Sequence, residues 1–129
     1  EASRCALTCL TKMLSQKKAV SAFLREHRIL LKTAYDATRR ALVEQGLPHL
    51  RARAGLFLLL DLRKYANTRE ETCSLWQILL DECNVNITPA PCLGCPSGWF
   101  RLCFAYNPIE KTVNAVAKIG QMLKAYDAS

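Results

Sequence analysis

One charged side chain, Arg101, interrupts a stretch that is otherwise apolar and strand-forming, Gly-Trp-Phe-Arg-Leu-Cys-Phe-Ala over residues 98–105. A guanidinium among bulky hydrophobic residues is costly to bury unless a carboxylate or a phosphate meets its planar array of donors. Arg101 is therefore the first candidate for a binding or catalytic role toward an anionic or carbonyl group. The sequence leaves one structural alternative open, in which Arg101 only pairs with an acidic residue such as Asp61.

Cysteines are the second set of residues that could do chemistry, and there are seven, at positions 5, 9, 73, 83, 92, 95 and 103. Cys92 and Cys95 have the spacing of half a zinc site, and Cys83 and Cys103 could complete a set of four thiolates. A zinc site ordinarily shows a second pair of that spacing, which this sequence lacks, so we expect no bound metal. The pair precedes a proline and a serine in a loop, which also disfavours a thioredoxin-like role.

The histidines and the basic side chains give weaker signals. His27 falls on the apolar face of an expected long helix, where a core or interface role fits better than that of a catalytic base. His49 follows a proline in a loop that we expect to be exposed. No serine lies in a nucleophile-turn motif, so a Ser-His-Asp hydrolase is not indicated. A basic stripe on the long helix lacks stacking aromatic residues and therefore predicts a solvated face rather than a nucleic-acid interface. The stripe consists of Arg25, Arg28, Lys32 and Arg39.

Length and composition limit the remaining classes. The chain has 129 residues, 50% of them hydrophobic and 22% charged, which suits one compact domain with its own core. A formal net charge of +7 favours anionic ligands or surfaces without choosing among them. The longest apolar run, residues 56–60, is too short to span a bilayer, and residues 1–14 lack the long apolar stretch of a secretory signal. We therefore expect a cytoplasmic protein without a membrane partner.

Hydrophobic periodicity and end signals predict the helices that must position these residues. One helix is expected at residues 3–14, and a longer one runs from 17 to 45, where Gly46 provides a C-terminal cap. Thr68, followed by a glutamate three positions later, has the form of a capping box at the start of a third helix. Asn107, followed by a proline, predicts the N-cap of the last helix, whose buried residues should be Ile109, Val113, Val116 and Leu123.

Short apolar or alternating stretches predict strands at residues 54–62, 84–88 and 98–105. The resulting order is typical of an α/β fold, here an α+β sandwich in which helices cover a small, mainly antiparallel sheet. We expect a single domain over residues 1–129, and its parts are a helical arm at 1–47 and an α/β core at 48–129.

Several motifs, taken in this order, resemble one enzyme family. They are Ala54-Gly55-Leu56-Phe57 leading to Asp61-Leu62-Arg63, then Leu75-Trp76, then Val85-Asn86-Ile87-Thr88-Pro89, and finally Gly98-Trp99-Phe100-Arg101-Leu102-Cys103-Phe104-Ala105. The series is similar to the C-terminal small domain of 1-aminocyclopropane-1-carboxylate synthase-like enzymes, which belong to the fold type I pyridoxal-phosphate aminotransferases. The start of the chain resembles the helices that link the large and small domains of that family.

The resemblance implies a role for Arg101, because the arginine of the Gly-Trp-Phe-Arg motif binds the substrate α-carboxylate in that family. The lysine that forms the cofactor Schiff base and the phosphate-binding residues belong to the family's large domain, which we expect this chain to lack. No lysine here matches the Schiff-base motif. We therefore expect no cofactor and no pyridoxal-phosphate chemistry by this chain alone.

The chain departs from the family in the loop that precedes the arginine motif. The family has Ser-Pro-Gly followed by a small residue, an aromatic residue and a histidine, whereas this chain has Thr88-Pro89-Ala90-Pro91-Cys92-Leu93-Gly94. Because that loop borders the substrate in the family, the change indicates a pocket that no longer needs the family's amino-acid selectivity, or simple drift.

Two functional hypotheses follow. In the first, the chain is a stand-alone, cofactor-independent derivative of the small domain that binds a hydrophobic carbonyl or carboxylate compound, as a cyclase or isomerase in natural-product biosynthesis, with Arg101 as its catalytic residue. Self-association into a homo-oligomer through residues 3–14 and 17–45 would cover exposed apolar surface. The pocket between subunits would be lined by Phe23, Leu24, Phe57, Trp99 and Phe104. In the second, the chain is a non-catalytic remnant or a fragment of a larger pyridoxal-phosphate enzyme and supplies the carboxylate-binding arginine.

Overall fold

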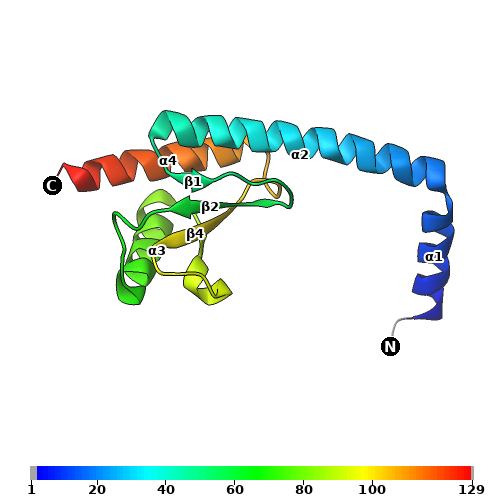
Figure 1. The fold of residues 1–129 in the computed structure, drawn as a ribbon, viewed down its shortest axis with the longest axis horizontal. Coiled ribbons are helices and arrows are strands. Elements are labelled where there is room, and N and C mark those ends of the chain that lie inside the picture. Colours follow the sequence, from blue (N-terminus) through cyan, green and yellow to red (C-terminus); the bar gives the residue numbers. More distant parts are fainter. Residues whose placement is uncertain (1–2, 129) are drawn as a thin grey trace. The chain divides into compact units, whose positions relative to one another are not determined.

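The computed structural model describes residues 3–128, and the chain divides into two compact units, residues 1–33 and 34–129. Figure 1 shows the order of the elements along the chain. The division falls within the long helix, whereas the sequence placed the end of the helical arm at residue 47. None of the helices in the described part of the chain is long and apolar enough to cross a membrane.

The first unit consists of α1 (Arg4–Ser15) and the beginning of α2 (Lys17–Gln45). On α1, Leu7, Leu10 and Leu14 recur at helical spacing and form an apolar stripe, yet no residue of α1 is buried. Both predicted helices, at 3–14 and 17–45, are confirmed to within one residue at each end.

The end of α2, which belongs to the second unit, shows why the helix stops where it does. Gly46 has a φ of +70°, a left-handed conformation that glycine adopts without strain. The Gly46 N–H donates to the Val43 carbonyl at 3.0 Å and the Leu47 N–H donates to the Leu42 carbonyl at 2.9 Å. This is a Schellman motif, so the predicted glycine cap is confirmed.

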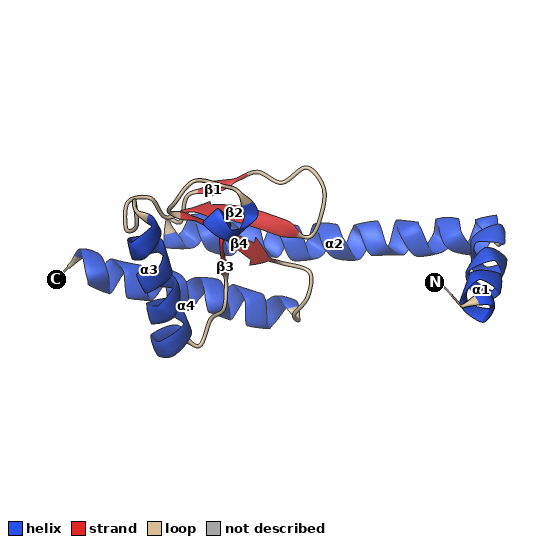
Figure 2. Ribbon diagram, turned by 90° about the horizontal axis from the view of Figure 1, so that it is seen from below, coloured by secondary structure: helices blue, strands red, loops and turns tan. Residues whose placement is uncertain are grey.

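A four-stranded antiparallel sheet forms the centre of the second unit, with the strand order β1-β2-β4-β3 (Figure 2). Its strands are β1 (His49–Leu50), β2 (Phe57–Asp61), β3 (Thr88–Pro89) and β4 (Trp99–Cys103). Leu59 of β2 and Thr88 of β3 are both paired with Arg101 of β4, one on each side. Arg101 therefore lies on a strand that has neighbours on both edges.

The core of the second unit lies on one face of this sheet. In β2 and β4 every second side chain is buried, namely Leu58, Leu60, Phe100 and Leu102. Buried residues of α2, of α3 (Arg69–Cys83) and of α4 (Ile109–Asp127) complete the core, among them Leu42, Leu79, Val116, Ile119 and Leu123. A small antiparallel sheet covered by helices confirms the predicted fold class.

Helix α3 begins with the capping box that the sequence predicts. The Glu71 N–H donates to the Thr68 Oγ1 at 3.1 Å, and the Thr68 N–H donates to the Glu71 Oε2 at 3.1 Å. The Asn67 N–H donates to the same oxygen at 2.6 Å. These backbone hydrogen bonds hold the pKa of Glu71 below its ordinary value.

The strand predicted at residues 84–88 is wrong in its extent, since only Thr88–Pro89 pairs with β4. Asn84 adopts a left-handed conformation with a φ of +52° and caps α3. The Val85 N–H donates to the Leu79 carbonyl at 3.1 Å, so the chain is still completing the helix end where the alternating pattern suggested a strand. A short 3-10 helix, η1 (Ala90–Leu93), follows directly after β3.

Three smaller expectations also need correction. Helix α4 begins at Ile109 with Pro108 at its N-cap and no side-chain cap, so Asn107 does not have the predicted role. Ile109 and Val113 are half-buried, whereas Val116 and Leu123 are buried as predicted. His49, expected in an exposed loop, is half-buried on β1, where its Nδ1 lies 2.9 Å from the Leu47 carbonyl oxygen.

Candidate functional site

Opposite the core, the sheet of the second unit presents a face whose side chains are only half-buried or exposed. Antiparallel Cα partners share a face, so the pairs Phe57 with Cys103, Leu59 with Arg101 and Asp61 with Trp99 place these side chains together. Thr88 joins them because it is paired with Arg101 from the other side. We call this surface the open face, and it consists of Phe57, Leu59, Asp61, Thr88, Trp99, Arg101 and Cys103.

Arg101 is held on the open face by a ring and a hydroxyl. Its Cζ atom lies 4.3 Å from the centroid of the Phe57 ring, which is a cation–π contact. Its Nη2 donates to the Thr88 Oγ1 at 3.4 Å, a long hydrogen bond. Within residues 3–128 Arg101 forms no ion pair. The guanidinium is thus oriented by its neighbours but is not neutralised by any of them.

Asp61 does not pair with Arg101, so the structural alternative left open by the sequence is wrong. Its carboxylate instead accepts two hydrogen bonds from Arg63, from Nε to Oδ1 at 2.8 Å and from Nη2 to Oδ2 at 2.7 Å. These bonds hold the pKa of Asp61 below its ordinary value and raise the pKa of Arg63. The Arg63 Cζ also lies 5.1 Å from the centroid of the Trp99 ring.

The start of β4 is fixed by Gly98. Its φ is +78°, and a Cβ at this position would lie 2.3 Å from the Ala66 carbonyl oxygen. Its N–H donates to the buried Thr72 Oγ1 at 2.9 Å, and its carbonyl accepts from the Leu62 N–H at 2.8 Å. The two hydrogen bonds of the Gly98 backbone and the close approach of Ala66 therefore determine how the strand that carries Arg101 enters the sheet.

The structure brings some of the predicted site residues together and leaves others apart. Phe57, Trp99 and Arg101 share the open face. Phe104 is only 3% exposed, continues the buried side of β4 and packs edge-on against Tyr35 at 5.6 Å between ring centroids. Phe23 is 56% exposed on α2, where its ring lies 4.2 Å from that of His27. It belongs to the first unit, as Leu24 does, so no common pocket with Arg101 is assembled within the second unit.

Two contacts of the open face were not anticipated from the sequence. The role of Thr88 is not visible in the sequence, because its pairing with Arg101 depends on which strands are neighbours. Arg63 stood two residues after Asp61, and this spacing alone was a signal for their ion pair. The sequence instead suggested Arg101 as the partner of Asp61.

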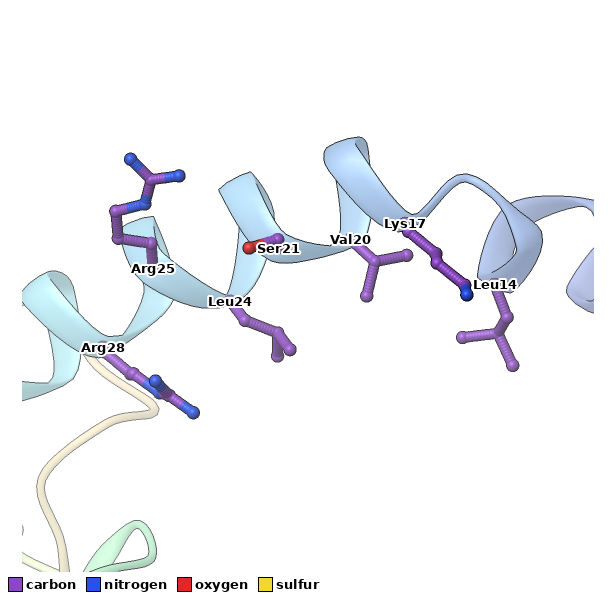
Figure 3. A pocket seen from close by; sticks show the side chains of 7 residues that line it. All are labelled: Leu14, Lys17, Val20, Ser21, Leu24, Arg25 and Arg28. Atoms are coloured by element: carbon purple, nitrogen blue, oxygen red, sulfur yellow. The ribbon is translucent and has the colours of Figure 1, made fainter.

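Hollows in the surface occur elsewhere in both units. One of about 380 Å³ lies in the first unit and is lined by Leu14, Lys17, Val20, Ser21, Leu24, Arg25 and Arg28. Figure 3 shows Leu14, Val20 and Leu24 on the same side of the ribbon, whereas Arg25 points away from them. Another of about 190 Å³ lies in the second unit between Tyr65, Tyr126 and the beginning of α3. Neither of these two hollows is lined by Arg101.

The cysteines do not converge on a common centre. Cys92 is exposed and Cys95 is half-buried. Cys83 is buried, and both this burial and the nearby Glu82 raise the pKa of its thiol. Among residues 3–128 no three His, Cys, Asp or Glu side chains are grouped so that they could hold a metal ion.

The chain is similar over most of its length to known enzymes. Residues 2–119 match the family model described as aminotransferase class I and II. The chain is 33% identical over 121 residues to 1-aminocyclopropane-1-carboxylate synthase 4 of Solanum lycopersicum, covering 92% of this chain and 25% of that protein. It is 36% identical over 114 residues to the 1-aminocyclopropane-1-carboxylate synthase of Nicotiana tabacum, covering 85% and 23%. It thus spans about a quarter of the length of these relatives.

Solved structures show the same fold. An aromatic aminotransferase from Pyrococcus horikoshii superposes with a TM-score of 0.77 at 20% identity, over 92% of this chain and 31% of that one. LysN, an α-aminoadipate aminotransferase from Thermus thermophilus, superposes with a TM-score of 0.74 at 24% identity, over 92% and 30%. The resemblance seen in the sequence is therefore confirmed. Because the family model matches nearly the whole chain, the chain belongs to the class I and II aminotransferase family.

Proposed function

We propose that this chain supplies the carboxylate-binding part of an aminotransferase-type site and that Arg101 binds the α-carboxylate of the substrate. The observation that carries the proposal is the state of Arg101 on the open face, where a ring and a hydroxyl orient its guanidinium but no carboxylate among residues 3–128 neutralises it. The relatives support the proposal, since 1-aminocyclopropane-1-carboxylate, the compound in their names, is an amino acid with one carboxylate.

The geometry of Arg101 suits bidentate binding of a carboxylate. A guanidinium has five N–H donors, and Arg101 uses one of its nitrogens, Nη2, toward Thr88. The Phe57 ring lies against the guanidinium, so an incoming carboxylate would meet the free edge of the group in its own plane. Half-burial strengthens such a contact, because fewer water molecules compete for the same donors.

The residues present do not form a complete site for pyridoxal phosphate. The four strands of the described chain contain no lysine. Lys64 is bound to Asp127, Lys118 donates to the Cys83 carbonyl and Lys124 donates to Gln45. We therefore derive no chemical step through that cofactor, and the role proposed for this chain is confined to holding the carboxylate.

Two other hypotheses stay predictions. A stand-alone cyclase or isomerase is favoured by no observation in the described residues. Of the aromatic residues predicted for its pocket, Phe57 and Trp99 share the open face with Arg101, whereas Phe104 is buried and Phe23 belongs to the first unit. Self-association has one supporting fact, the exposure of large apolar side chains in the first unit, which include Leu7, Leu10, Met13, Leu14 and Phe23.

Carboxylate binding by the full chain tests the proposal. The Nε–Hε signals of the arginines in ¹⁵N-labelled protein are followed by NMR while 3-phenylpropionate is added. We expect Arg101→Ala to abolish binding and Arg101→Lys to weaken it about tenfold, because lysine keeps the charge but loses the planar fork. Arg53→Ala, at an exposed arginine of the same unit, is the matched control and should bind as the unaltered chain does.

A circular-dichroism melt establishes that each variant is folded. Binding that survives in folded Arg101→Ala, or no binding by the unaltered chain, would overturn the proposed function.

A further inference from the structure

We infer that Asp61 determines which carboxylic acids the open face accepts. Because Asp61 binds Arg63, Arg101 is left as the one free guanidinium among the described residues of this face. The ligand is thereby restricted to monocarboxylates with an apolar side group. This inference rests on the proposed role of Arg101.

Two arginines approach the same part of the open face. The Arg63 Cζ lies over the Trp99 ring, and Arg101 follows Trp99 by two residues on the same side of β4. Residues two apart on a strand are separated by about 6.6 Å along the strand, so Arg63 lies over the residue next to Arg101 on the same face. Without a further contact, this face would present two cations.

Asp61 removes one of them. Its two oxygens take Nε and Nη2 of Arg63, the same pair of donors that a ligand carboxylate would use. The Arg63 backbone N–H also donates to the Asp61 Oδ1, at 3.2 Å, which fixes the carboxylate relative to the chain. A second ligand carboxylate would have to displace this internal one from a geometry that is already satisfied.

The ion pair between Asp61 and Arg63 is too exposed to contribute much to the stability of the fold. The side chain of Asp61 is 23% exposed and that of Arg63 is 54% exposed, and ion pairs with such access to water contribute little to folding. The consequence of the pair is therefore expected in ligand choice. The ion pair leaves Arg101, and not Arg63, able to bind an anion at the open face.

Apart from Asp61, Thr88 and Arg101, the side chains of the open face are apolar. Leu59 lies opposite Arg101, and Phe57 and Cys103 face each other beside it. No further Lys, Arg or His occurs in the strand segments that form this face. A ligand anchored by one carboxylate on Arg101 would therefore place its other end against aromatic and aliphatic groups, which favours an apolar side group over a second charge.

The test compares succinate with 3-phenylpropionate on the full chain, with the arginine Nε–Hε signals as readout. For the unaltered chain, 3-phenylpropionate is expected to bind at least fivefold more tightly than succinate and to shift the Arg101 signal but not that of Arg63. In Asp61→Asn, succinate binding relative to 3-phenylpropionate should improve three- to tenfold, because Arg63 is released. The double variant Asp61→Asn with Arg63→Gln should return the ratio to that of the unaltered chain.

A matched control is Asp81→Asn, which removes the same charge from α3, where the Asp81 carboxylate accepts hydrogen bonds from Gln77. This variant should leave the ratio unchanged. The inference is overturned if Asp61→Asn leaves the ratio unchanged, if the double variant keeps the gain, or if Asp81→Asn gives the same gain through net charge. The Arg101→Ala result is independent of these outcomes, so failure of the proposed function is recognised separately.

Discussion

Replacing Gly98 by alanine should destabilise the fold more than the same change at any glycine that is strained only in its backbone. At φ +78° an alanine is in the left-handed region, which costs about 1–2 kcal/mol. Its Cβ would also lie 2.3 Å from the Ala66 carbonyl oxygen and 2.8 Å from the Arg63 Cα, and both are backbone atoms that cannot rotate away. Overpacking of this kind adds about 1–3 kcal/mol, so we expect a total loss of about 2–5 kcal/mol.

Urea unfolding followed by circular dichroism measures this loss. With a slope of about 2 kcal/mol/M, the midpoint of Gly98→Ala should fall by about 1–2.5 M. Gly55→Ala is the matched control, because Gly55 has a φ of +85° but nothing within 4 Å of its would-be Cβ, so only the backbone strain of about 1–2 kcal/mol applies.

Equal losses in the two variants would refute the reasoning, since the close approach at Gly98 would then carry no energy. A larger loss in Gly55→Ala would refute it as well.

Three further changes probe local features of the fold. Thr68→Ala removes the side-chain half of the capping box and should cost about 1 kcal/mol in urea unfolding. Leu60→Ala, at a fully buried position of β2, should cost about 2–5 kcal/mol, and Leu59→Ala on the open face should cost less than half of that. Acidification should also destabilise the chain, because Asp61 and Glu71 have lowered pKa values in the folded state. Their stabilisation is present at neutral pH and is lost as the pH falls below about 4, so the urea midpoint should decrease from about pH 6 to about pH 3.

Each of these three predictions would be contradicted by a specific result. Thr33→Ala is the control for Thr68→Ala, because the Thr33 hydroxyl donates to the Ile29 carbonyl of its own helix and caps no helix end. Equal stability of the two variants would show that the capping contact of Thr68 does not stabilise the fold. Equal effects at Leu59 and Leu60 would contradict the assignment of the two faces. A midpoint that rises on acidification would contradict the direction of both pKa shifts.

Local signals in the sequence predicted the helices well. The capping box at Thr68 and the glycine cap at Gly46 each involve contacts within a few residues, so their residue types alone determine the geometry. The strand at 84–88 failed for a related reason. An alternating apolar pattern does not reveal that Asn84 turns left-handed to close the preceding helix.

The arrangement around Arg101 was only partly accessible from the sequence. Its neighbours Leu59 and Thr88 come from separate strands, and no local pattern specifies that pairing. By contrast, the side chains of a strand alternate between its two faces, so Phe104, three residues after Arg101, is expected on the opposite face. This periodicity alone argues against a pocket shared by Phe104 and Arg101, and Phe104 is buried in the structure. The competition between Arg63 and Arg101 for Asp61 depended on side-chain geometry, which the sequence does not contain.

The two outer strands of the sheet have a consequence for how copies of this chain can meet. Both β1 and β3 are only two residues long, and β3 ends in Pro89, which has no N–H to offer to a neighbour. Short edges that carry proline are poor templates for the addition of another strand. Expression at high concentration should therefore not lead to fibre growth through the sheet, and any association must use side-chain surfaces, whose composition can be redesigned without altering the backbone pairing.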